Sequence, residues 1–300
     1  MDQQSNNCFV LGNKEAPLCI IKLIDSDEAI KEFSKVDQFI ENMGEFDLQS
    51  RLNTTEKVTK EDYIQFIVKH IMSWTPEYVQ LLSSSIDDLN ANSLDILQLT
   101  KFPSEVLVLL TDGKDESGAA YCRNLNMVVL PITKVPPVTE SSIAALASGN
   151  AWQTTFPHEL FHIISRNNPV LRDKLYANIG YYPIPDNKSA DLPQALSHLK
   201  VTNPDAPLAK HYIELCANNS ENQLVKLAPI IMASKSYSPD DNKNFFDYVE
   251  VVFGILDDKW EISNLIPYDD TIGFYDKVGN NTDYIMHPEE ILADNFVLLV

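Results

Sequence analysis

The stretch His158-Glu159-Leu160-Phe161-His162 decides how the rest of the chain is interpreted. On an α-helix, two residues four apart lie about 40° apart around the axis and roughly one turn apart along it. The imidazoles of His158 and His162 can therefore converge on one metal ion. Glu159 then points beside that ion, where its carboxylate can take a proton from a water molecule that the metal activates. The sequence thus predicts a metal centre on a helix.

The residues around this stretch predict a short, mostly apolar helix. Thr155 is a suitable N-cap, and Pro157 falls in the expected first turn, where its missing N–H costs little. Asn168 should end the helix, because the residue before a proline disfavours helical backbone angles. The alternative interpretation is a core helix that carries two incidental histidines.

The pattern HExxH, here residues 158–162, is typical of zinc hydrolases, mainly peptidases. A chain with six His among 300 residues should contain it about 0.01 times by chance. A catalytic zinc site also needs a third protein ligand and an open position for water. The best source is a downstream pair, Glu290 and Asp294, which share a helix face. One carboxylate can bind the metal, and the other can accept the second N–H of a ligand histidine.

The HExxH motif followed by a downstream ExxxD resembles the gluzincin clan of zinc metallopeptidases, which includes the thermolysin-like enzymes. The resemblance implies that His158 and His162 are the first two zinc ligands and that Glu159 is the general base. It makes Glu290 the third ligand and Asp294 the partner that orients a ligand histidine. It also implies an α+β, zincin-like fold, in which a small twisted sheet precedes the active-site helix and the other parts are largely helical.

The gap between His162 and Glu290 is longer than in the better-known gluzincins. It predicts an inserted subdomain or a long substrate-binding region. Glu289 is the obvious alternative third ligand, and Glu214 and Glu221 are remoter ones. The acidic pair after Pro288 also fits a simpler role, in which both carboxylates stabilise a helix N-terminus.

Hydrophobic spacing predicts a helical region over residues 1–100, packed on a zincin-like metallopeptidase domain over residues 101–300. Within the second region, compact apolar runs predict strands, and a hairpin should join two of them. The edge strand of such a sheet can bind an extended peptide by strand addition. The expected strands span 105–110, 119–123, 127–130, 225–231 and 249–255, and a final helix spans 291–300.

Composition narrows the possible partners. An apolar content of 44% with 22% charged residues is ordinary for a soluble globular protein. A net charge of −20 without a basic cluster argues against nucleic acid and against an anionic membrane surface. No apolar run suggests a transmembrane helix or a secretion signal, so we expect a cytoplasmic protein or one exported by a signal-less route. Four scattered cysteines predict reduced thiols, and frequent Asn and Lys with few Gly are typical of an AT-rich bacterial genome.

These observations predict a zinc-dependent metallopeptidase that hydrolyses peptide bonds of a peptide or protein substrate with metal-activated water. The alternative is a catalytically inactive zincin-fold protein that binds a partner. The presence of Glu159 favours catalysis, because a structural metal site has no use for a base. The tetrahedral oxyanion should gain a further hydrogen-bond donor. Tyr284 is the first candidate, followed by His211, Tyr212 and His198.

Overall fold

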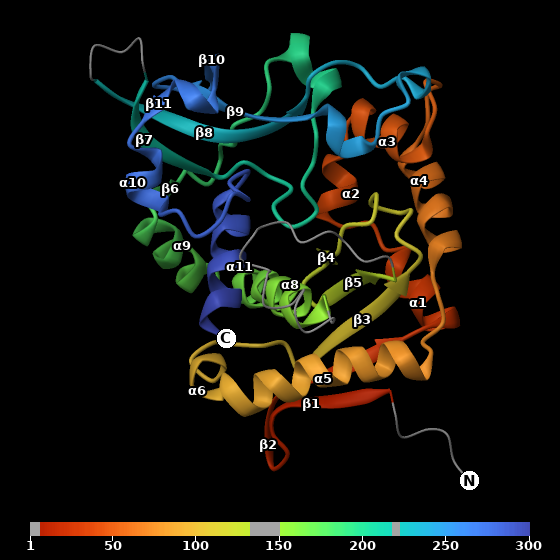
Figure 1. Cartoon of the computed structure of the whole chain (residues 1–300). Helices are drawn as coiled ribbons and strands as arrows, with labels where there is room; N and C mark the ends of the chain where they lie inside the picture. The colour runs from red at the N-terminus through yellow and green to blue at the C-terminus, as the bar shows by residue number, and fades with distance from the viewer. Residues whose placement is uncertain (1–6, 133–150, 218–222) are drawn as a thin grey trace. The chain divides into compact units, whose positions relative to one another are not determined.

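The computed structural model describes residues 7–132, 151–217 and 223–300 of the chain (Figure 1). The protein is of the α+β class, and its elements form two compact units that are both discontinuous in sequence. The first unit comprises Met1–Asp37, Ile64–Pro169 and Leu292–Val300, and the second comprises Gln38–Tyr63 and Val170–Ile291. Neither unit follows the expected division at residue 100, because residues 1–100 contribute elements to both.

A five-stranded mixed sheet forms the centre of the first unit, in the order β1-β2-β3-β5-β4. Its middle strands β2, β3 and β5 are parallel, while β1 and β4 run antiparallel to their neighbours. Strand β3 is buried along almost its whole length, which explains its uninterrupted apolar run. The strands predicted at 105–110 and 127–130 are confirmed, and the one predicted at 119–123 is confirmed from Tyr121 onward. The strands are β1 (Cys8–Asn13), β2 (Ala16–Ile24), β3 (Glu105–Thr111), β4 (Tyr121–Arg123) and β5 (Met127–Pro131).

The expected helical character of residues 1–100 is wrong for the first part of that region, where β1 and β2 form a hairpin. The second half of β2, from Ile20 to Ile24, pairs with β3 inside the sheet. A short apolar run cannot be assigned to helix or strand by its periodicity alone, so only the distant partner strand settles its conformation. From Ser26 onward the region is helical, as its spacing predicts.

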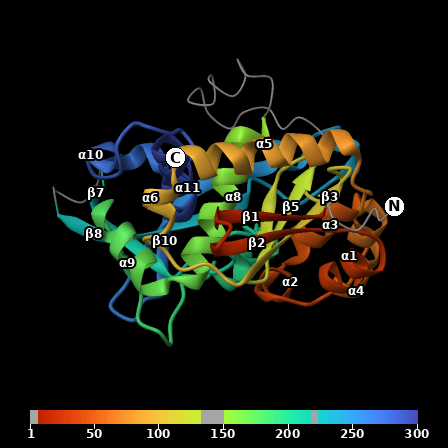
Figure 2. The same ribbon diagram turned by 90° about the horizontal axis from the view of Figure 1, so that it is seen from below.

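Helices cover the sheet of the first unit. The longest, α5, lies against β1 and against α8 (Figure 2). Its first turn begins with Pro76, and the Thr75 side chain accepts a hydrogen bond from the backbone N–H of Tyr78, so that this end is capped. The helices are α1 (Ser26–Phe33), η1 (Val68–His70), α5 (Pro76–Asn92), α6 (Leu94–Leu97) and α8 (Trp152–Asn167).

The second unit contains a separate antiparallel sheet in the order β10-β9-β8-β7-β11, with β6 also paired to β7. The strands predicted at 225–231 and 249–255 are confirmed as parts of β8 and β9. The insertion expected between the two sequence motifs is therefore mainly this sheet and its loops. The strands are β6 (Tyr181–Pro183), β7 (His211–Ala217), β8 (Leu224–Ala233), β9 (Val249–Leu256), β10 (Ile262–Pro267) and β11 (Thr271–Ile272).

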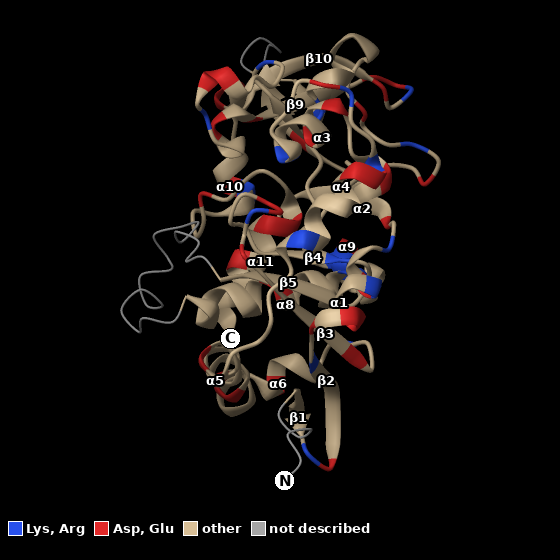
Figure 3. Cartoon of the chain, turned by 90° about the vertical axis from the view of Figure 1, so that its right-hand side faces the viewer, with Lys and Arg blue, Asp and Glu red and all other residues tan. Residues whose placement is uncertain are grey.

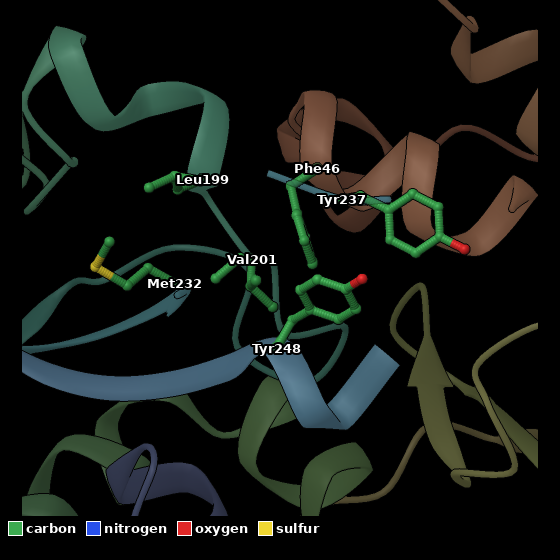
Figure 4. Close-up of a cluster of buried hydrophobic side chains, with 7 residues drawn as sticks. Phe46, Leu199, Val201, Met232, Tyr237 and Tyr248 are labelled. Carbon is green, nitrogen blue, oxygen red and sulfur yellow. The ribbon is translucent and has the colours of Figure 1, made fainter. Parts of the chain in front are cut away.

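The second unit has its own hydrophobic core. Phe46 packs against Tyr237 and Tyr248, with ring centroids 6.3 and 5.6 Å apart, and Leu199 and Met232 lie in the same cluster (Figure 4). The short helices of the second unit are α2 (Gln38–Asn42), α3 (Glu45–Leu52), η3 (Gln194–Leu199), η4 (Pro239–Asp241), η5 (Phe245–Tyr248), η6 (Tyr268–Asp270) and α10 (Phe274–Val278).

Three helices include residues of both units: α4 (Lys60–Ile67), α9 (Pro169–Asn178) and α11 (Pro288–Leu299). The helix predicted at 291–300 is confirmed as most of α11. Acidic and basic segments are interspersed in both units (Figure 3). Within the described parts of the chain, no helix is both long and apolar enough to cross a membrane.

Candidate metal centre

Helix α8, which carries the HExxH motif, begins earlier than its sequence predicts. It starts at Trp152 instead of after Thr155, so Pro157 lies inside the helix. The Trp152 ring is buried and packs against Trp74 and Tyr78, with centroids 6.2 and 5.8 Å away. Burial of this large ring favours the extra turn, even though Pro157 cannot donate a helical hydrogen bond. The helix ends at Asn167, as expected.

The three polar residues of the motif gather at one point of α8. Potential ligand atoms of His158, Glu159 and His162 all lie within 4.8 Å of one another. The two imidazole centroids are 4.9 Å apart, with their planes inclined by 80°. Glu159 and His162 are buried, at 3% and 0% exposure, among the apolar residues of the helix. The helix therefore places these side chains as its four-residue spacing predicts.

Asp294 holds the ring of His158. The distance from Asp294 Oδ1 to His158 Nδ1 is 2.9 Å, so the contact expected between Asp294 and a histidine of the motif is present. An ionised carboxylate only accepts hydrogen bonds, so in the neutral ring of His158 the proton is on Nδ1 and the lone pair is on Nε2. This tautomer is the one in which Nε2 can bind a metal ion.

Cys122, on strand β4, contacts Glu159 and was not expected at the site. Its Sγ lies 3.2 Å from the Glu159 carbonyl oxygen and 3.4 Å from Glu159 Oε2. The thiol can donate a weak hydrogen bond to either oxygen. Because β4 packs beside α8, this contact fixes Glu159 relative to the last strand of the described sheet.

Glu290 belongs to the second unit, in the first turn of α11, and is 1% exposed. Asn203 Nδ2 donates a hydrogen bond to Glu290 Oε1 over 2.7 Å. The other end of the Asn203 amide accepts from the backbone N–H of Asp205, at 2.9 Å, which fixes its orientation. Glu290 therefore has one carboxylate oxygen held by a loop far away in sequence, and it precedes Asp294 by four residues on one helix.

Glu289 occupies a different environment from Glu290. Its carboxylate accepts a hydrogen bond from the hydroxyl of Tyr176, and both side chains are buried. Its backbone N–H donates to His287 Nδ1 over 3.1 Å. Successive helical residues point about 100° apart, so the two glutamates face different neighbours. The environment of Glu289 indicates a structural anchor for the start of α11.

His287 is a buried residue beside this helix start. Burial lowers the pKa of His287 to about 4, so its imidazole is neutral at neutral pH. Since Nδ1 accepts from Glu289, the proton of the neutral ring is on Nε2. Within the described residues, Nε2 has no hydrogen-bond partner and is buried.

The other candidates from sequence belong to the second unit. His211 is buried, with Nε2 3.2 Å from Asp173 Oδ1, and burial lowers its pKa. Its role as an oxyanion donor stays a prediction, as does that of Tyr284. Of the rest, Tyr212 and Glu214 are half-buried on β7, His198 is exposed on η3, Tyr284 is half-buried before α11, and Glu221 lies outside the described residues.

Sequence reasoning missed Asn203 and Cys122. Asn203 stands in a proline-rich loop, and Cys122 is one of four scattered cysteines. No local pattern distinguishes either residue, because their importance comes from contacts with Glu290 and Glu159 that span 87 and 37 positions.

No protein-family model matches this chain, and no curated protein or solved structure was found to match it. The resemblance to gluzincins therefore continues to depend on the HExxH and ExxxD motifs. The chemistry of the site has to be argued from its own side chains.

Proposed function

We propose that this protein is a zinc-dependent peptidase of the gluzincin type with a zincin-like fold. One observation carries the proposal: Asp294 lies 2.9 Å from Nδ1 of His158, the first histidine of the HExxH motif. Histidines that ligate metals almost always donate their second N–H to a carboxylate, a carbonyl or water. Here the carboxylate belongs to the ExxxD motif, so two sequence signals separated by more than 100 residues meet at one imidazole.

The side chains present fit a zinc ion. His158 keeps a lone pair on Nε2, and His162 lies close enough for its ring to share the same ion. Glu290 is the proposed third ligand, because it lies one helical turn before Asp294 on α11 and its carboxylate is oriented by Asn203. Two imidazoles and one carboxylate leave a position open for water, as catalytic zinc sites require.

Zinc, when bound, lowers the pKa of water to about 7 and polarises the carbonyl of the scissile bond. Glu159 accepts the proton of the attacking water on its carboxylate and returns it to the leaving nitrogen as the C–N bond breaks. Its 3% exposure keeps bulk water from this carboxylate, and Cys122 limits its rotation. Asp294 keeps the His158 ring in one tautomer throughout.

A peptide is the substrate that the first unit favours. Strand β4 is the last in the order of the described sheet, and it packs beside α8. An extended peptide can add to such an edge through main-chain hydrogen bonds. The net charge of −20 speaks against a nucleic acid.

The test is metal-dependent hydrolysis of an unstructured protein. Purified protein should cut it, should lose this activity after dialysis against a chelator, and should regain it with about one equivalent of zinc per chain. Hydrolysis that survives complete removal of zinc would contradict the proposal. A zinc-loaded chain that cuts no peptide would favour the alternative, a zincin-fold binding protein.

A further inference from the structure

Asp47, on α3 in the second unit, is a buried carboxylate that the proposed chemistry does not use. Arg51, one turn further along the helix, lies with Nη1 2.8 Å from Asp47 Oδ1, and the backbone N–H of Gly44 donates to Oδ2 over 2.9 Å. The side chains of Asp47 and Arg51 are only 0% and 2% exposed. Replacing such a buried ion pair by apolar residues is often neutral for stability, so its presence favours a role in fixing position.

Thr202 gives Asp47 two further donors, from 155 positions away. Its backbone N–H donates to Oδ1 over 3.0 Å, and its hydroxyl donates to Oδ2 over 2.7 Å. The hydroxyl oxygen also lies 3.1 Å from the carbonyl oxygen of Asn42, but its single proton favours the nearer and charged carboxylate. Each oxygen of Asp47 thus accepts two hydrogen bonds, as its lone pairs allow.

Packing holds α3 and the segment before Thr202 together. Phe46 and Val201, the residues directly before Asp47 and Thr202, lie in the same hydrophobic cluster (Figure 4). The backbone N–H of Val201 also donates to Ile231 O on β8 over 3.3 Å. Thr202, at 2% exposure, is therefore held between α3 and the sheet of the second unit.

Asn203, the next residue, presents its amide to Glu290. Its Nδ2 donates to Glu290 Oε1 over 2.7 Å, and its Oδ1 accepts from the backbone N–H of Asp205 over 2.9 Å. Because consecutive Cα atoms are about 3.8 Å apart across a trans peptide, a fixed Thr202 confines the point from which the Asn203 side chain starts. A series of contacts thus leads from Asp47 to Glu290 within the second unit.

We infer that Asp47 and Thr202 are positioning residues for the zinc site, because they fix the loop from which Asn203 orients Glu290. This inference rests on the proposed function, in which Glu290 is the third ligand. Neither residue is assigned a contact with the metal or the substrate. Their effect is on zinc affinity, and it is transmitted through Asn203.

The experiment measures the zinc affinity of the metal-free full chain by competition with a chelator of known affinity, at a temperature where circular dichroism shows each variant folded. Thr202→Val removes the hydroxyl donor at nearly constant volume. Asp47→Asn replaces one acceptor by an amide nitrogen, which cannot accept, so either variant can carry the test if the other does not fold. Thr271→Val is the matched control, because it removes another half-buried hydroxyl of the second unit, which donates to Tyr268 O over 2.9 Å.

Thr202→Val and Asp47→Asn should each weaken zinc binding by about 10-fold, the lower end of the range for a lost orienting partner. Thr202→Ser, which keeps the hydroxyl, and Thr271→Val should bind zinc like wild type. In an Asn203→Ala background the effect of Thr202→Val should disappear, because substitutions that act through one shared contact are not additive. A loss of stability alone would leave the zinc affinity of the folded protein unchanged.

Wild-type zinc affinity in whichever of Thr202→Val and Asp47→Asn folds would overturn the inference and leave the peptidase proposal standing. An equal loss of affinity in the wild-type and Asn203→Ala backgrounds would also overturn it, because Thr202 would then act by another route. If the wild-type chain binds no zinc, the proposed function and this inference both fail.

Discussion

Helices α8 and α11 hold their site residues in different ways. On α8, His158 and His162 lie roughly one turn apart with Glu159 between them, so the geometry of the helix alone brings the three together. On α11, Glu290 depends on Asn203, 87 positions away, and Asp294 reaches a histidine 136 positions away. The difference teaches that replacing any one residue of the motif on α8 should abolish its own chemical role while leaving the positions of the others unchanged. For the residues on α11, replacing a distant partner should weaken zinc binding in part, because the partner only orients the side chain.

The largest effect should come from Glu159 on α8, the proposed general base. Glu159→Gln keeps the size of the side chain but cannot accept the proton of water, so kcat/KM for peptide hydrolysis should fall by about 10²- to 10⁴-fold. Zinc content and melting temperature should stay close to those of wild type. Glu77→Gln, at an exposed position on α5, is the control. An active Glu159→Gln protein would show that the base is another group.

On α11, the two neighbouring glutamates should behave differently. Glu290→Ala removes the proposed third ligand, so zinc affinity should fall by more than the roughly 10- to 100-fold typical of a lost orienting partner. Glu289→Ala should leave zinc affinity nearly unchanged. The substitution should still lower the free energy of unfolding by about 1–3 kcal/mol, because it leaves the buried hydroxyl of Tyr176 without its hydrogen-bond acceptor. Zinc titrations and denaturant unfolding measure the two effects, and a reversal of the zinc result would make Glu289 the ligand.

Replacing Asn203 should lower zinc affinity less than replacing Glu290, the proposed ligand that Asn203 orients. Asn203→Ala removes the hydrogen bond to Glu290 Oε1, and zinc affinity should fall by about 10- to 100-fold. Asn178→Ala, at an exposed position on α9, provides the comparison in the same titration. Equal zinc affinities for the two variants would mean that Asn203 does not orient Glu290 for zinc binding.

The smallest effect concerns the pH dependence of stability next to α11. Burial depresses the folded-state pKa of His287 from 6.5 to about 4, so as pH falls the unfolded chain binds the proton first. Its contribution to stability is complete above pH 6.5 and is lost toward pH 4. Between pH 6.5 and 5.5 the loss should be about 1 kcal/mol.

Unfolding of His287→Gln by urea across this interval should show a shallower pH slope than wild type, whereas His198→Gln, at an exposed position, should not. Parallel slopes in wild type and His287→Gln would contradict a buried neutral imidazole.

The parts of the fold that follow from local periodicity could be predicted. Strands β3, β8 and β9 are mainly apolar runs, and α11 has an acidic first turn, so each element carries its own signal in the sequence. The hairpin β1–β2 carries no such signal, because β2 is held in the sheet by pairing with β3, more than 80 residues later. The start of α8 was also misplaced, since burial of Trp152 outweighs the local preference of Pro157 for a first turn.

The candidate site likewise has a part that local sequence predicts and a part that depends on contacts between distant residues. The HExxH motif fixes its own geometry, and the same-face relation of Glu290 and Asp294 follows from their spacing. The contacts of Asn203 and Cys122 could not be foreseen, because an amide or a thiol becomes part of a site only through the fold that delivers it. Sequence reasoning therefore identifies the reactive groups more readily than the residues that hold them.

The central claim is that the HExxH motif binds zinc, and elemental analysis of the purified protein tests it most directly. Protein prepared without chelator should contain about one zinc per chain. The double variant His158→Ala/His162→Ala should contain almost none while the wild-type preparation, purified alongside it, keeps its metal. Wild-type protein free of zinc, or an undiminished zinc content in the double variant, would contradict the account.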